Sequence, residues 1–211
     1  MAWTFLRITR NTHMKKIPLK DTQEKNFGYW LPDSFFKELH YLDQQASGEI
    51  LVDNPDIPSI EKERYLISSL MEEAIASSQL EGAATTRKIA KEMLKFGRKP
   101  KNRSEQMIYN NYHTIKQIKD YKDKPLSIEM LKLLHKSMTE DTLDDSNTSG
   151  RFRNTDEPIV VATPEGEILH DPPPAKELPE RMMKLCKYAN EDDNSGFTHP
   201  VIKAIILHFW L

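Results

Sequence analysis

The chain has 211 residues, and its 30 Lys and Arg against 32 Asp and Glu give a formal net charge of −2. This near balance predicts no general attraction to nucleic acid or to a membrane surface, so neither is an expected partner. No stretch approaches the ~20 apolar residues that cross a bilayer, and the first residues lack a secretory signal. The single cysteine, Cys186, excludes an internal disulfide. We therefore expect a cytoplasmic protein with no metal site.

The first part of the chain is predicted to be an irregular N-terminal arm followed by helices. The arm comprises residues 1–31, which lack clear periodicity. Apolar residues then recur at helical spacing on one side of a first helix, at Phe35, Phe36, Leu39 and Leu42. Ser59 can cap a second helix that runs to about residue 82, and Thr85 or Thr86 can cap a short third helix.

A basic linker at residues 98–103 is predicted to be solvated and to mark a boundary. It separates an N-terminal helical segment, residues 32–100, from a core, residues 101–211. Ser104 and Ser127 are predicted to begin two amphipathic helices. Their apolar stripes consist of Ile108, Tyr112 and Ile115, and of Ile128, Leu131, Leu134 and Met138.

The pattern then changes from helix to strand. Apolar residues at 159–161 and 168–169 flank Thr163-Pro164-Glu165-Gly166, where Pro and Gly suit a type I turn. This is the only strand pair that the sequence supports, and another helix follows the prolines at 172–174. The sequence predicts a mainly α protein with one β-hairpin.

The last helix is predicted to begin with Thr198 as its cap and Pro200 in its first turn. Residues 201–211 are apolar on almost every side, which is typical of a helix in the middle of a core. No capping glycine or polar last turn follows, so we expect a further C-terminal segment or a covering subunit. A short central helix packed by earlier elements is the alternative.

Glu81 is an unexpected residue at the end of the second helix. Positions 67, 70, 74, 77 and 81 lie on one face, so Glu81 would continue an apolar stripe. The helix dipole is negative there and disfavours a carboxylate by up to ~1 kcal/mol unless a cation meets it. Either an arginine of a neighbouring element pairs with Glu81, or the stripe has turned to solvent and Glu81 is a surface residue.

Ser77-Ser78-Gln79-Leu80-Glu81-Gly82 resembles the inhibitory-helix motif of Fic proteins, in which Ser or Thr, three residues, and Glu precede Gly or Asn. Other segments resemble the family in the same order along the chain: Arg103-Ser104-Glu105-Gln106, Asn110-Asn111, Leu131–His135, Gly150-Arg151-Phe152-Arg153, Pro172-Pro173-Pro174 and His199–Phe209. The resemblance covers roughly residues 33–211. It implies a Fic-type helical bundle with the hairpin as its target-docking flap, preceded by an N-terminal helical segment.

The catalytic signature of the family, His-Pro-Phe-x-(Asp/Glu)-Gly-Asn-(Gly/Lys)-Arg, does not occur in residues 1–211. His199-Pro200 is followed by Val201 and is therefore not that motif. By resemblance, the motif would begin a few residues beyond Leu211. We assign no catalytic residue and expect the chain to be inactive alone.

The resemblance implies a protein adenylyltransferase, which moves AMP from ATP to a Ser, Thr or Tyr hydroxyl of a target protein. The intact protein is expected to use ATP and Mg²⁺. Ser77, Glu81 and Gly82 would form the inhibitory motif, with Glu81 paired to the last arginine of the catalytic signature. A target would dock by strand addition on the flap residues, Ile159, Val160 and Val161, for which ordinary sheet packing is the alternative.

Other side chains have two interpretations each. Arg151 and Arg153 would contact phosphate or form structural ion pairs, while His135 and His208 are interpreted as packed helix residues. The alternative function is a non-catalytic regulatory or protein-interaction module, whose partner would cover the last helix. A homo-oligomer is compatible with either function, and a helical DNA-binding domain is disfavoured by the charge balance.

Overall fold

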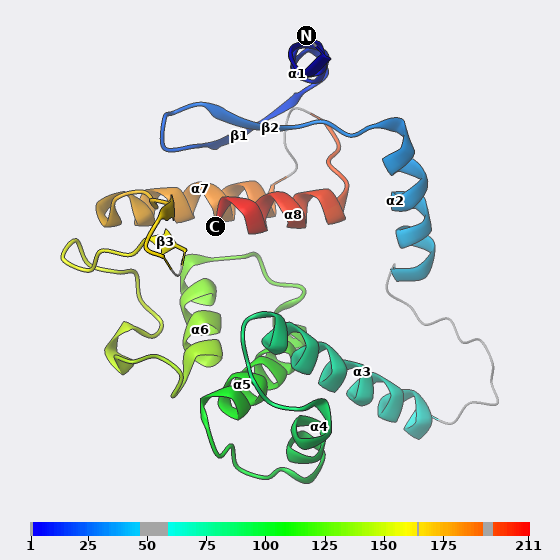
Figure 1. Cartoon of the computed structure of the whole chain (residues 1–211). Helices are drawn as coiled ribbons and strands as arrows, with labels where there is room; N and C mark the ends of the chain where they lie inside the picture. The colour runs from blue at the N-terminus through cyan, green and yellow to red at the C-terminus, as the bar shows by residue number, and fades with distance from the viewer. Residues whose placement is uncertain (1, 47–58, 164, 192–195) are drawn as a thin grey trace. The chain divides into compact units, whose positions relative to one another are not determined.

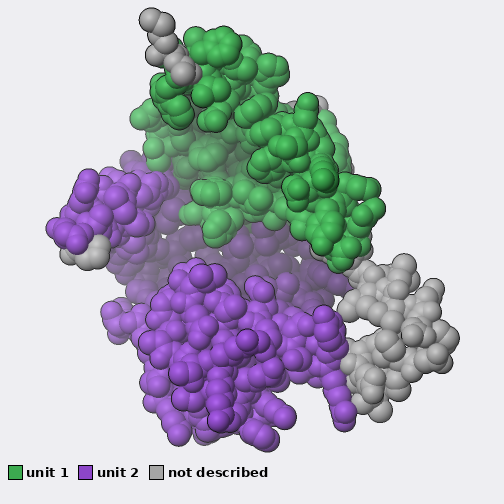
Figure 2. All heavy atoms as spheres, turned by 45° about the vertical axis from the view of Figure 1, so that its right-hand side comes forward, with its two compact units in different colours: residues 1–51, 180–211 green, residues 52–179 purple. Residues whose placement is uncertain are grey.

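The computed structural model describes residues 2–46, 59–163, 165–191 and 196–211 (Figure 1). It divides into two compact units, one of residues 1–51 and 180–211 and the other of residues 52–179 (Figure 2). The described residues are mainly helical, and they include two antiparallel hairpins. The predicted mainly α fold with a flap hairpin is confirmed, although the sequence did not reveal the other hairpin. The two units do not follow the predicted boundary near residue 100.

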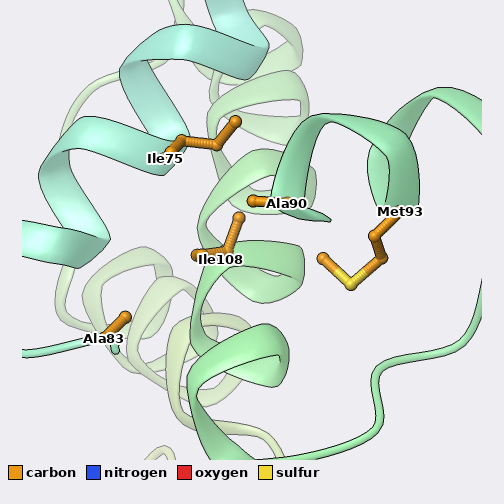
Figure 3. Close-up of a cluster of buried hydrophobic side chains, with 5 residues drawn as sticks. All are labelled: Ile75, Ala83, Ala90, Met93 and Ile108. Atoms are coloured by element: carbon orange, nitrogen blue, oxygen red, sulfur yellow. The ribbon is translucent and has the colours of Figure 1, made fainter. Parts of the chain in front are cut away.

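The unit of residues 52–179 is built mostly from four helices. They are α3 (Ser59–Leu80), α4 (Arg87–Phe96), α5 (Arg103–Ile118) and α6 (Ile128–Thr139), with short 3₁₀ turns η1 (Lys119–Tyr121), η2 (Ser146–Thr148) and η3 (Ala175–Glu177). Strands β3 (Val161–Ala162) and β4 (Ile168–His170) follow α6. Helices α3, α4 and α5, together with the connection between α3 and α4, contribute a buried apolar cluster of Ile75, Ala83, Ala90, Met93 and Ile108 (Figure 3).

Local capping signals explain where these helices begin and end. Thr86 caps α4, Gly97 ends it in the left-handed conformation with φ 63°, and Ser127 caps α6. The predicted cap at Ser104 is wrong, because Asn102 accepts the Glu105 N–H and α5 begins at Arg103. Asn102 is the stronger cap because it is extended, whereas Ser104 already lies within the helix.

The unit of residues 1–51 and 180–211 contains three helices, most of a fourth, and one hairpin. Its elements are α1 (Ala2–Thr12), β1 (Lys15–Lys20), β2 (Asn26–Tyr29), α2 (Asp33–Ala46), α7 (Leu178–Asn190, apart from its first two residues) and α8 (Pro200–Trp210). The prediction of an irregular arm over residues 1–31 is therefore wrong. Ile17 and Leu19 alternate with polar or exposed neighbours and are buried, but two apolar positions are too few for a strand pattern to stand out in the sequence.

The last helix differs from its predicted form in three respects. His199, not Thr198, caps α8, because its Nδ1 accepts the Val201 N–H. One face is buried through Ile202, Ile206 and Trp210, whereas Phe209 is 77% exposed, so the helix is not enclosed on every side. His208 is exposed as well, and its prediction as a packed residue is wrong.

Among the helices that the structure describes, none combines the length and apolar character of a membrane-spanning segment.

Candidate functional site

The flap hairpin, residues 159–170, is short and exposed. Val161 pairs with His170 and Ala162 with Ile168, with a register irregularity between the two pairs. The Gly166 N–H donates to the Thr163 carbonyl at 2.9 Å, and Gly166 has φ 88°, a conformation that favours glycine. Pro164 of the predicted turn lies outside the described residues. Only Val161 of the three predicted docking residues belongs to a strand, because Ile159 and Val160 precede β3.

The apolar side chains of the flap hairpin are open to solvent. Val161 is 54% exposed, and the other exposed residues are Ile159, Val160, Ile168 and Leu169. Ordinary packing of a sheet against a core would bury alternate side chains, and this hairpin buries none of those five. Several exposed apolar residues in one hairpin are a feature of surfaces that bind other molecules.

A segment that we call the flap anchor, residues 150–157, joins the flap hairpin to α6. Gly150 has φ 72°, and a Cβ atom there would lie 2.9 Å from the Lys136 Cβ and 3.3 Å from the Lys132 carbonyl. Its N–H donates to the Nδ1 of His135 at 2.9 Å. His135 is exposed and is not the packed residue that the sequence predicted. Glycine is therefore required at this position by both backbone conformation and close approach.

Arg151 is fully engaged within the flap anchor. Its guanidinium binds the Glu157 carboxylate through two contacts of 2.8 and 2.5 Å, while its Nε donates to the Asn147 carbonyl at 2.7 Å. The Asn154 N–H also donates to Glu157, at 2.6 Å. Arg151 first, and then this N–H, lower the pKa of Glu157 from 4.5 to about 2. This geometry corresponds to the structural alternative for Arg151 and leaves it few donors for a phosphate.

The next two residues of the flap anchor make further contacts. The Phe152 ring lies under the ammonium group of Lys132 in α6, 4.5 Å from the ring centroid. Arg153 donates from Nη2 to the carbonyl of Pro173, which follows the flap hairpin. The anchor thus fastens the chain on both sides of the flap hairpin, while the tip of the hairpin has no such support among these contacts.

The predicted inhibitory motif lies where α3 ends. The buried side of α3 follows Met71, Ala74, Ile75 and Ser78, so it does not continue through Ser77 to Glu81. Glu81 directly follows the helix, is exposed, and forms no ion pair with any residue that the structure describes. Of the two interpretations of Glu81, the solvent-facing one describes this chain. Gly82, with φ 95°, then turns the chain away.

Polar contacts hold this end of α3 in place. Asn111 of α5 donates from Nδ2 to the Ser78 hydroxyl at 3.3 Å and to the Ala74 carbonyl at 3.4 Å. Gln79 donates from Nε2 to the Thr85 carbonyl at 2.7 Å. Glu81 is therefore exposed next to a helix end that these hydrogen bonds hold in place. Asn111 supports that end, and helical periodicity alone did not identify it.

Residues 125–211 match the model of the Fic/DOC family. This part of the chain, less than half of its length, is therefore similar to a Fic/DOC domain. The flap anchor, the flap hairpin, α7 and α8 lie within the matched residues, while α3 with Glu81 and the hairpin of β1 and β2 lie before them. Comparisons with curated proteins and with solved structures gave no significant match.

The basic segment before the Fic/DOC match is solvated as predicted at Lys99, Lys101, Asn102 and Arg103, but it also makes structural contacts. Arg98 binds Glu105 through two contacts of 2.8 and 2.9 Å, and the Lys101 N–H donates to the same carboxylate at 2.8 Å. Glu105 is only 4% exposed. Arg98 and the Lys101 N–H hold the pKa of this carboxyl below its usual value, against the effect of burial. A buried carboxylate needs such partners, and the linker supplies them.

A second candidate site is a cleft of about 600 Å³ in the unit of residues 1–51 and 180–211. It lies among the hairpin of β1 and β2, α2 and the residues that enter α8. Its lining combines aromatic and titratable side chains, among them Lys15, Tyr29, Trp30, Asp43 and His199. Within the described ranges, no group of three or more His, Cys, Asp or Glu is arranged to hold a metal ion.

Proposed function

We propose that this chain is the inhibitory and flap-bearing part of a Fic-family protein adenylyltransferase. The enzyme would transfer AMP from ATP to a Ser, Thr or Tyr hydroxyl of a target protein. The observation that carries the proposal is the Fic/DOC match over residues 125–211, which includes an anchored hairpin with exposed apolar side chains.

The flap hairpin suits docking by strand addition. A sheet of two strands leaves an unpaired edge on each strand, and such an edge offers N–H and C=O groups to an extended peptide. Ile159, Val160 and Val161 would add apolar contacts beside that edge. The flap anchor supports this role because it fixes the base of the hairpin and leaves the apolar side chains free.

Glu81 is proposed to be the inhibitory carboxylate, with Ser77 and Gly82 completing its motif. Its partner would be the last arginine of the catalytic signature, which does not occur in residues 1–211. The exposure of Glu81 supports the proposal, since a carboxylate without a cation in this chain remains accessible to one from outside it. Such a pair would place the carboxylate where ATP phosphate must otherwise bind.

We propose no site for ATP or Mg²⁺ among the residues that the structure describes. The described part of the chain has no cluster of metal-ligating side chains, and Arg151 and Arg153 already bind Glu157 and Pro173. By resemblance, ATP is the expected substrate and Mg²⁺ the expected cofactor of the intact protein, both held by the catalytic signature, and we derive no chemical step from residues 1–211.

The decisive test is to sequence the coding region beyond Leu211 and to assay the encoded protein for self-modification with ATP and Mg²⁺. We expect the catalytic signature to follow, and Glu81→Gly and Glu81→Gln to raise AMP incorporation several-fold. Glu73→Gln, at another exposed position of α3, is the matched control and should leave incorporation unchanged. If no catalytic signature follows, the alternative function as a non-catalytic interaction module replaces the enzyme.

A further inference from the structure

The residues that lead into α8 are held from outside the Fic/DOC match. Lys15, at the start of β1, donates from Nζ to the carbonyls of Gly196 and Phe197 at 3.2 and 2.8 Å and to the Thr198 hydroxyl at 3.3 Å. The Tyr29 hydroxyl of β2 lies 3.3 Å from the same Thr198 hydroxyl. One ammonium group thus satisfies three acceptors just before the helix begins.

A third contact comes from α2. The Nε2 of His199 lies 3.1 Å from both carboxylate oxygens of Asp43. The other ring nitrogen, Nδ1, accepts the Val201 N–H at 3.3 Å and so caps α8. This pair of contacts assigns the proton to Nε2, because Nδ1 must be an acceptor. Asp43 therefore orients the imidazole that caps the helix.

The opposite end of α8 is tied to the end of the same strand. Trp210 donates from Nε1 to the carbonyl of Lys20 at 2.9 Å, and Arg181 of α7 donates to that carbonyl at 3.2 Å. The Arg181 guanidinium also lies 4.8 Å from the centroid of a Trp210 ring. Both ends of β1 thus meet the two ends of α8.

The dimensions of the two elements agree with this arrangement. A six-residue strand spans about 16 Å, and a helix of eleven residues spans about 15 Å. Between its ends, β1 buries Ile17 and Leu19, while α8 buries Ile202 and Ile206. Buried apolar side chains resist rotation of a helix, whereas polar contacts at both termini fix its position along the axis.

We infer that β1 holds α8 in position. Lys15, Tyr29 and Asp43 are then positioning residues of the Fic/DOC domain, although they lie before residue 125. Loss of these contacts loosens the first turn of α8 without disturbing α3, α4 and α5. The effect on catalysis rests on the proposed function, because the resemblance makes α8 the helix that runs toward the catalytic loop.

Hydrogen exchange followed by mass spectrometry tests the inference on this chain without any activity. In Lys15→Met, amides of residues 201–205 should exchange about tenfold faster, the effect of losing one charged hydrogen bond. Lys15→Arg should restore slow exchange. Lys16→Met is the matched control, since Lys16 is an exposed neighbour on the same strand. Unchanged exchange in Lys15→Met would contradict the inference that β1 holds α8 in position.

A spectroscopic measurement keeps the test decisive if Lys15→Met unfolds. Long-range ¹⁵N NMR should show His199 with its proton on Nε2 in the unaltered chain. Asp43→Asn should add the other tautomer and speed exchange at Val201. A single unchanged tautomer in Asp43→Asn would contradict the role of Asp43.

Activity provides a separate readout in the protein that includes the catalytic loop. Lys15→Met should lower self-modification and Lys15→Arg should restore it. If Lys15→Met exchanges faster but the unaltered protein transfers no AMP, the proposed function is refuted and the inference about β1 and α8 is retained. If Lys15→Met shows normal exchange and full AMP transfer, the inference about β1 and α8 is refuted and the proposed function is retained.

Discussion

The two hairpins of this protein have the same strand pairing and opposite relations to their surroundings. The hairpin of β1 and β2 buries Ile17 and Leu19 to 2% and 1% exposure. Its Lys15 binds the residues that lead into α8, and its Lys20 carbonyl accepts from Trp210 of α8. The hairpin of β3 and β4 exposes its apolar side chains, and the contacts that hold it among the described residues lie at its base. The comparison shows that a hairpin can support a neighbouring helix when its apolar side chains are buried. It remains available for binding when those side chains meet solvent.

The largest expected difference between the hairpins is in stability. Leu19→Ala should lower the free energy of unfolding by about 2–5 kcal/mol, because it removes a buried side chain and leaves a cavity. Val161→Ala should lower it by less than about 0.5 kcal/mol, because Val161 is already exposed. Urea unfolding monitored by circular dichroism measures both values. Equal losses would show that the flap hairpin is packed in solution and is not a free docking surface.

A smaller effect is expected at the glycine of the flap anchor. Gly150→Ala should cost about 2–3 kcal/mol, because it combines a left-handed backbone with a Cβ placed 2.9 Å from Lys136. Gly166→Ala is the matched control, since it has a similar positive φ but no atom within 4 Å of the added Cβ. It should cost about 1 kcal/mol. Similar costs in urea unfolding would mean that the close approach of Gly150 to α6 is not maintained.

The smallest effect concerns pH and the pair of Arg151 and Glu157. The folded-state pKa of Glu157 is lowered from 4.5 to about 2, so its stabilising contribution is complete above pH 4.5 and is lost as pH falls through about 2. The Asn154 amide signal, followed by NMR, should therefore shift with a midpoint near pH 2. Arg151→Met should raise that midpoint toward 4.5. Arg153→Met should leave it unchanged, because the Arg153 guanidinium binds the Pro173 carbonyl and not Glu157. An unaltered midpoint in Arg151→Met would show that the pair does not form in solution.

Neither residue of that pair was assigned to the other from the sequence. Glu157 lies six residues after Arg151 in a segment that is neither helix nor strand, so no helical or strand periodicity connects them. The burial of Glu105 is similar. Its segment reads as a charged linker, and only the fold brings Arg98 and the Lys101 N–H to the same carboxylate.

The sequence alone determined those features that depend on neighbours a few residues away. The mainly α fold, a cap at Thr85 or Thr86, the cap at Ser127 and a turn within the flap hairpin follow from helical spacing, capping side chains and turn residues. The structure selects Thr86 as the cap of α4. The ordered motifs of the Fic resemblance were readable for the same reason, since each is a short local pattern.

Only the tertiary structure decided which of those patterns face solvent and which are held from afar. The direction of Glu81 depends on where α5 meets α3, and the role of β1 depends on contacts between Lys15 and Phe197, 182 residues apart. A strand with two apolar residues carries too little periodicity to be recognised by itself. Its polar contacts depend on where α8 lies, and no local sequence signal specifies that position.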